Sequence, residues 1–159
     1  MTAPVRIVVR GNTVSQGSMK HLGKGRISHS KGKRLKAWRD AVAWAAKAAM
    51  VGRKPYEKTP LVLSATFYVE HDGSLFGLPI GQQHGDLSKM IRAIEDALGG
   101  QKRTKRRAAL PGIVFDDDAR IAKFTDVAKE FAKDKPGAVI TVREWTEADR
   151  STVLSTEVG

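Results

Sequence analysis

The 159-residue chain has no cysteine, few aromatic residues and no long apolar run. The lack of cysteine excludes disulfide bonds and thiolate zinc sites, and it favours a protein of the reducing cytoplasm. No apolar run approaches the ~20 residues that a transmembrane helix requires, so a membrane is not expected among its partners. The first ten residues also lack the apolar stretch and small-residue cleavage site of a secretory signal.

Acidic residues are almost missing from the first third of the chain. Residues 1–56 contain 13 basic residues and a single acid, Asp40, whereas residues 57–159 contain 15 basic and 16 acidic residues. The formal net charge of +11 therefore comes entirely from the N-terminal segment. Such a distribution indicates a polyanionic partner, most simply nucleic acid, although a basic face that only aids solubility is the plainer alternative. Charge alone does not distinguish DNA from RNA or from an anionic membrane surface.

The hydrophobic pattern predicts seven elements in the order β-α-β-α-β-β-β. Apolar residues alternate in the expected strands and recur every three or four residues in the expected helices. A hairpin is predicted around the turn at residues 133–137. The strands are expected at residues 5–10, 61–70, 113–115, 121–131 and 138–145, and the helices at residues 35–50 and 86–98.

This order predicts an α+β fold in which two helices pack on a mixed β-sheet. The length suits one domain, which we place at residues 1–146. Within it, residues 11–36 are expected to form a basic, glycine-rich arm and residues 99–112 a basic loop. Residues 147–159 are predicted to be a polar C-terminal tail that frays.

The start of the second predicted helix carries the first candidate constellation. Ser88 and Arg92 lie on the polar side of the helix, opposite an apolar stripe, and Asp86 lies at the edge of that stripe. An acid at this position commonly caps the helix or complements its dipole. Taken alone, Asp86 is better explained in that way than as a catalytic group.

A run of three aspartates follows the apolar residues 113–115. Three adjacent carboxylates repel one another and suit a strand poorly. At the end of a strand they offer the oxygen ligands that a hard divalent cation prefers. An acidic turn explains Asp116, Asp117 and Asp118 equally well, and these residues alone do not decide between the two interpretations.

Basic side chains of the arm and the loop are the candidate contacts to phosphate. Five of the seven residues at 101–107 are basic. Such a run is often only a solvated segment or an address tag, but its place between the two acidic elements strengthens the case for contacts to a phosphate backbone. The predicted DNA-binding residues are Lys20, Lys24, Arg26, Lys31, Lys33, Arg34, Lys102, Arg103, Lys105, Arg106 and Arg107.

Two stretches together resemble a known family. GDLSKMIRAIEDAL at residues 85–98, followed by IVFDDDARI at residues 113–121, is similar to the RusA-type Holliday-junction endonucleases, which are common in phages and prophages. The N-terminal layout is also similar, with a first strand, a basic arm and a helix that begins near Trp38-Arg39-Asp40. The resemblance covers roughly residues 4–145.

The resemblance implies a Mg²⁺-dependent endonuclease that resolves four-way DNA junctions in recombination and repair. Asp86 and Asp118 match the catalytic, metal-binding aspartates, and Arg92 matches the basic residue that stabilises charge on the scissile phosphate. Ser88 stands where the family has a further aspartate, for which Asp116 or Asp117 is a candidate substitute. Mn²⁺ is a possible replacement for Mg²⁺. Because a four-way junction is nearly two-fold symmetric, a homodimer is expected.

Two other functions remain open from the sequence. Ser88 and the basic arm are also compatible with a protein that binds branched DNA and cuts it weakly or not at all. A single-strand or RNA-binding accessory protein is less well supported, since aromatic residues make up only 6% of the chain.

Overall fold

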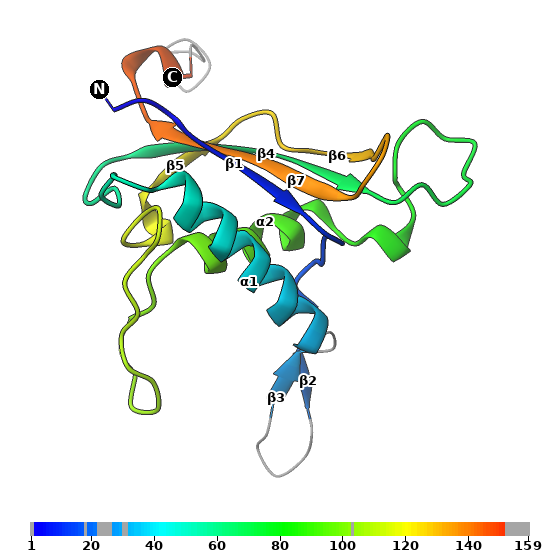
Figure 1. The fold of residues 1–159 in the computed structure, drawn as a ribbon, viewed down its shortest axis with the longest axis horizontal. Helices are drawn as coiled ribbons and strands as arrows, with labels where there is room; N and C mark the ends of the chain where they lie inside the picture. The colour runs from blue at the N-terminus through cyan, green and yellow to red at the C-terminus, as the bar shows by residue number, and fades with distance from the viewer. Residues whose placement is uncertain (1, 18, 22–26, 30–31, 103, 152–159) are drawn as a thin grey trace, which may run out of the picture.

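The computed structural model describes residues 2–17, 19–21, 27–29, 32–102 and 104–151. Figure 1 shows a sheet with both long helices on one of its faces. The strands are β1 (Val5–Arg10), β2 (Met19–His21), β3 (Ile27–His29), β4 (Leu61–Val69), β5 (Ile121–Phe124), β6 (Ala128–Phe131) and β7 (Gly137–Glu144). The helices are α1 (Gly32–Ala49) and α2 (Leu87–Leu98), with short 3-10 turns at Gln82–His84, Asp118–Arg120 and Glu147–Asp149.

The main sheet has five strands in which β7 and β4 are central. β7 pairs antiparallel with β1 on one side and with β4 on the other. The second edge of β4 carries two short parallel strands in succession, β5 along its first part and β6 along its second. The sheet is therefore mixed, and the predicted α+β class with two packed helices is confirmed.

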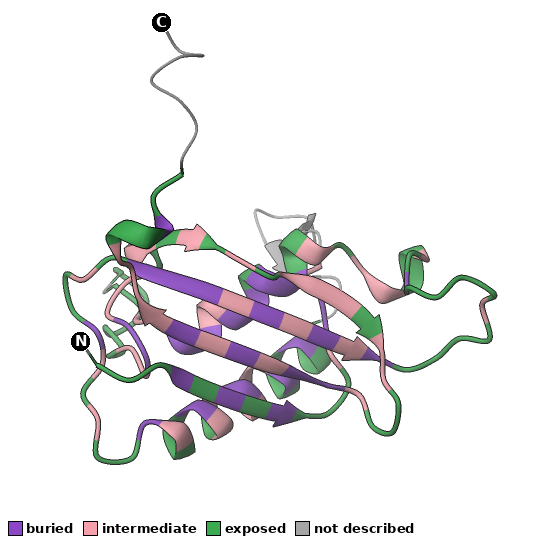
Figure 2. Ribbon diagram, turned by 90° about the horizontal axis from the view of Figure 1, so that it is seen from above, coloured by how far each residue is buried: buried purple, intermediate pink, exposed green. Residues whose placement is uncertain are grey.

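The core lies between the sheet and the two helices. Buried and less buried residues alternate along β1, β4 and β7, as Figure 2 shows, because successive side chains point to opposite faces. α1 contributes Leu35, Trp38, Val42 and Ala46 to this core, and α2 contributes an apolar stripe that includes Met90, Ile94 and Leu98. Arg39 of α1 forms an ion pair with Asp96 of α2 beside the core and so joins the two helices.

The predicted hairpin between residues 121–131 and 138–145 is wrong. The first segment divides into β5 and β6, which pair with β4, and β7 inserts between β4 and β1. β7 is largely buried, whereas β5 and β6 are shorter and only partly buried. The more apolar strand thus takes a central position, where both of its edges are paired, and the more polar ones take the edge.

Two further sequence predictions are corrected. Residues 113–115 are not a strand of the sheet: Phe115 makes only isolated bridges to Tyr56 and Gly99. Residues 11–36 are not one loop, because β2 and β3 form an antiparallel pair and α1 begins at Gly32. The short bridges at Phe115 nevertheless tie the segments that follow α1 and α2 to each other.

The domain also extends beyond the predicted boundary at residue 146. The turn Glu147–Asp149 begins with a capping box between Thr146 and Asp149. Arg143 donates two hydrogen bonds to the buried Asp149 carboxylate, at 2.5 and 2.7 Å. These contacts attach the turn to β7, which the polar sequence of the turn gave no reason to expect.

Among the described residues, neither α1 nor α2 combines the length and the apolar character that crossing a bilayer requires.

We expect Asp149→Asn to lower the melting temperature by a few degrees at pH 7. The Arg143 guanidinium holds the pKa of Asp149 well below its usual range. A depressed pKa in the folded state contributes stability above the unfolded pKa of about 3.9, and that contribution disappears as the pH falls through the folded value. The difference between variant and wild type should therefore narrow below about pH 4. Thermal melts at pH 7 and below about pH 4 test this prediction. The control is Asp134→Asn, a change in an exposed carboxylate.

Candidate active site

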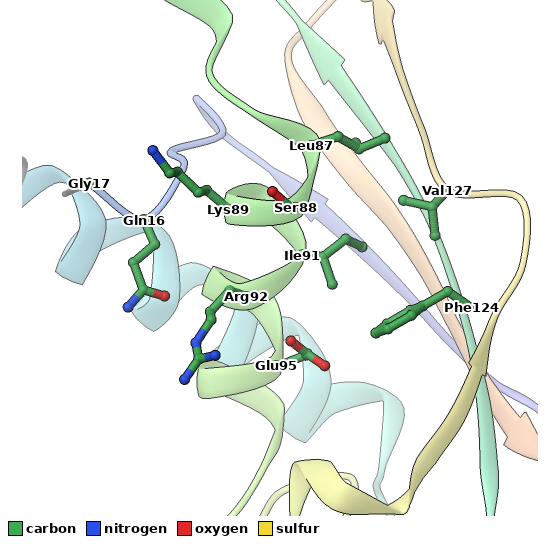
Figure 3. A pocket seen from close by; sticks show the side chains of 10 residues that line it. All are labelled: Gln16, Gly17, Leu87, Ser88, Lys89, Ile91, Arg92, Glu95, Phe124 and Val127. Carbon is green, nitrogen blue, oxygen red and sulfur yellow. The ribbon is translucent and has the colours of Figure 1, made fainter.

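The outward face of α2 lines the most apolar large cavity of the described residues. This cavity of about 700 Å³ lies between α2, the loop before β2 and the edge of the sheet at β5. Figure 3 shows the side chains that surround it. They are Gln16, Leu87, Ser88, Lys89, Ile91, Arg92, Glu95, Phe124 and Val127, with Gly17. Predicted site residues Ser88 and Arg92 are thus brought to one cavity, as expected from their spacing of one helical turn.

The beginning of α2 is held by backbone contacts from two sides. Lys129 of β6 donates to the carbonyl oxygen of Gly85 at 2.8 Å, and the backbone N–H of Gln16 donates to the carbonyl oxygen of Lys89 at 3.0 Å. Gly85 has φ +80° and ψ 169°, a region that is essentially restricted to glycine. These contacts fix the direction in which the first turn of α2 presents its side chains.

A histidine–aspartate pair supports the loop that leads into α2. His84 Nε2 lies 2.8 Å from Asp72 Oδ2, and the Gln83 amide donates to the same oxygen. The His84 ring also meets Phe131 of β6 edge to face. This pair lies outside the cavity beside α2 and connects residues 72–84 to the end of the sheet.

Asp86 occupies the N-cap position of α2 but does not cap it with its side chain. Its exposed carboxylate lies 3.1 Å from the Lys89 ammonium instead. The capping explanation that the sequence favoured is therefore only half right. Asp86 occupies the N-cap position, but its carboxylate makes no capping hydrogen bond and lies exposed at the surface.

The three consecutive aspartates have different surroundings. Arg120 donates to both oxygens of Asp116, at 2.8 and 2.9 Å, and holds its pKa below the usual value. Lys102 of the basic loop lies 2.9 Å from Asp117 and, together with the backbone N–H of Ala119, holds the pKa of Asp117 well below its usual range. Asp118 is exposed. Asp116 and Asp117 are thus held in ion pairs with Arg120 and Lys102, whereas Asp118 presents its carboxylate at the surface.

Glu95 is a candidate site residue that the sequence reasoning missed. It is half-buried, and in Figure 3 its carboxylate points toward Phe124 across the cavity. Burial raises the pKa of this carboxyl, the charge of Asp118 raises it further, and Arg92 opposes both effects. The charge of Asp118 therefore reaches the third turn of α2. The spacing of seven residues from Ser88 to Glu95 on one helix face was the signal available in the sequence.

The carboxylates around α2 are possible oxygen ligands for a metal ion, at most two at a time. Among the described residues, no group of three or more His, Asp or Glu side chains is placed to hold a metal ion. Asp86 and Glu95 start about 13 Å apart along the helix axis. Two carboxylates are still a sufficient protein contribution for Mg²⁺, which commonly completes its shell with water and substrate phosphates. The pair Glu95 and Asp118 has the donor chemistry for such an ion, and the ligand roles of Asp86, Asp117 and Asp118 remain predictions.

The predicted phosphate-binding residues lie on several elements. Lys33 and Arg34 belong to the first turn of α1, and Lys20 lies in β2. Lys105, Arg106 and Arg107 are exposed in the loop that Figure 1 shows extending from the helix side of the molecule, where Thr104 and Arg107 pair across the turn. Lys24, Arg26, Lys31 and Arg103 lie outside the described residues. The described part of this loop is linked to the acidic run by Lys102.

No protein-family model matches the chain, and no curated protein matches it. The function therefore has to be inferred from the site itself and from the resemblance in its two acidic motifs.

We expect Gly85→Ala to destabilise the protein by about 3 kcal/mol, since its backbone conformation is one that other residues rarely adopt. A Cβ at this position would also lie 2.5 Å from Oγ of the buried Ser15. Gly73→Ala is the matched control, because Gly73 has φ +78° and open space around its Cβ position. Its cost should be about 1 kcal/mol.

Urea denaturation of both variants measures the difference. Equal destabilisation at the two glycines would show that the close approach to Ser15 contributes nothing to the position of α2.

Proposed function

We propose that the protein is a metal-dependent endonuclease that resolves four-way DNA junctions. One observation carries the proposal: the charge of Asp118, from the second acidic motif, acts on Glu95, and Glu95 lies on the face of α2 that also presents Ser88 and Arg92. Two elements that are distant in the sequence thus contribute acidic, basic and hydroxyl groups to one surface. Such a combination is what hydrolysis of a phosphodiester needs.

Asp118 is the central ligand in this proposal. Asp86 and Glu95 are nine residues apart on α2, about two and a half turns, so they do not share one ion, and each is a candidate second ligand beside Asp118. Bound Mg²⁺ would activate water and stabilise the leaving oxygen. Asp117 keeps its ion pair with Lys102 and so places the basic loop beside the site.

Arg92 and the basic loop bind the DNA backbone. Arg92 projects from the same helix face as Ser88, where its charge can stabilise the scissile phosphate. Lys105, Arg106 and Arg107 are exposed and free of the acidic run, and they contact phosphates away from the cleaved bond. Recognition of a branch by backbone contacts depends on the shape of the DNA more than on its sequence.

A homodimer places two such sites on the two-fold symmetric junction. A DNA-processing enzyme without cysteine also suits the reducing cytoplasm of a bacterial cell or a phage-infected host.

The alternative is a protein that binds branched DNA with little or no cleavage. It is favoured by the hydroxyl of Ser88 in place of a carboxylate, and by the absence of any three-residue metal group among the described residues. Mg²⁺-dependent cleavage of a synthetic four-way junction, beside a linear duplex of the same sequence, separates the two functions.

We expect Asp118→Asn to abolish cleavage while leaving junction binding intact, because it removes a metal ligand and a charge that repels phosphate. Ser88→Asp should increase cleavage at low Mg²⁺ by adding a carboxylate to the site.

Glu95→Gln should weaken Mn²⁺ binding about tenfold in calorimetry without DNA. The control for that measurement is Glu130→Gln, a change in an exposed carboxylate on β6.

Wild-type protein that binds the junction but never cuts it, at any Mg²⁺ or Mn²⁺ concentration, would favour the alternative function. Unchanged Mn²⁺ binding in Glu95→Gln would remove Glu95 from the proposed ligand set and leave Asp86 as the partner of Asp118.

Replacing Lys105, Arg106 and Arg107 together with alanine should weaken junction binding and its salt dependence. Every basic side chain that no longer reaches a phosphate should lower the slope of log affinity against log salt by about 0.9. A triple alanine variant of the exposed Lys54, Lys133 and Lys135 controls for the change in net charge, because it removes the same number of positive charges. Fluorescence anisotropy over a range of salt concentrations measures both slopes. If the two variants change the slope equally, the loop makes no specific phosphate contacts.

A further inference from the structure

We propose that the cavity beside α2 binds an unpaired nucleobase of the DNA at the branch point. The inference rests on the proposed function for a nucleic-acid partner, and it adds a base-binding site to a surface otherwise argued to contact phosphates. Three features of the cavity support it: an apolar lining, a polar atom without a partner, and a basic rim.

The apolar lining has the character that a flat, weakly hydrated ring prefers. Leu87 and Ile91 from α2 face Val127 and Phe124 across the cavity, as Figure 3 shows. Phe124 ends the edge strand β5, and its side chain remains 47% exposed although it borders an apolar surface. Bases stack on exposed aromatic rings of this kind in proteins that bind single strands. The volume of about 700 Å³ lies within the range of small-ligand sites.

Gln16 supplies a polar group that lacks a partner. Its side-chain oxygen Oε1 is buried and has no hydrogen-bond partner among the described residues. A buried carbonyl oxygen without a donor costs free energy, so a rotation of the Gln16 side chain that exposes this oxygen to an N–H group of a ligand in the cavity is favoured. The edges of nucleobases carry such donors. The backbone of Gln16 is held to α2 by its hydrogen bond to Lys89, so the side chain starts from a fixed point beside the cavity.

The charges around the cavity match a nucleotide better than an apolar peptide. Lys89 and Arg92 line the cavity from the exposed side of α2, where they can hold the phosphates that flank an inserted base, and Glu95 is the one acid among the lining residues. An apolar protein segment would cover these two cations without satisfying them. The occupant is therefore a base attached to a charged backbone, and a second copy of the chain becomes one outcome of the test.

The experiment compares a homothymidine strand of about 10 nucleotides with an abasic strand of the same length. Both carry the same phosphates, and only the first carries bases. Wild-type protein should bind the homothymidine strand about tenfold more tightly than the abasic strand. Phe124→Ala should remove this difference and leave the affinity for the abasic strand unchanged. Phe124→Leu, which keeps an apolar side chain at the edge of the sheet, should also lose most of the difference and serves if the alanine variant fails to fold.

Phe76→Ala is the matched control, because Phe76 is an exposed aromatic residue outside the cavity. It should keep the full preference for the strand with bases. Gln16→Leu should reduce the preference without affecting the abasic strand. Equal affinity of the wild type for the two strands would overturn the proposal, and so would an equal reduction of the preference in Phe124→Ala and Phe76→Ala.

A change of oligomeric mass in Phe124→Ala, measured by light scattering, together with an unchanged base preference would also overturn it, since the cavity would then cover a second copy. Base preference is independent of cleavage. If the protein prefers the strand with bases but never cuts a junction, the base-binding site is supported and the endonuclease function is refuted. If it cuts junctions without a preference for bases, the endonuclease function is supported and the base-binding site is refuted.

Discussion

The packing of α2 against the sheet is the constraint on which the site depends. Burial of Met90, Ile94 and Leu98 fixes the rotation of the helix about its axis. Ser88, Arg92 and Glu95, three and four residues apart, must then face the cavity at the edge of the sheet. The backbone contacts of Gly85 and Lys89 fix the beginning of the helix. Small changes in the packing of this helix would therefore move several candidate functional groups at once.

Ion pairs set the state of the acidic groups around this helix. Asp86, Asp116 and Asp117 each lie beside a basic side chain, whereas the charge of Asp118 acts on another carboxylate, that of Glu95. Exposed ion pairs contribute little free energy, so they can exchange one anion for another at small cost. This property suits a surface that receives DNA phosphates. The repulsion between the like charges of Glu95 and Asp118, in contrast, favours protonation of Glu95 or the binding of a cation.

The sequence predicted the long elements well because each has a strong period. β4, α1 and α2 lie within three residues of their expected ends. Strand pairing was harder, and the predicted hairpin failed because a turn signal at residues 133–137 does not reveal which strands lie on either side. The backbone groups on both edges of β7 are paired, on one side with β1 and on the other with β4. This placement depends on how residues are buried across the whole sheet. Asp149 was missed for a similar reason, since its partner Arg143 lies on a strand whose place was unknown.

For the site, the sequence by itself determined which helix face carries Ser88 and Arg92, because the apolar stripe of α2 leaves only one side for polar groups. It also determined that acidic motifs and basic segments alternate along the chain. Only the tertiary structure decided that the charge of Asp118 acts on Glu95, that Lys102 pairs with Asp117, and that Phe124 and Gln16 line the same cavity beside α2. These contacts join segments far apart in the chain. Their formation depends on how the sheet and helices pack, and no local pattern encodes that packing.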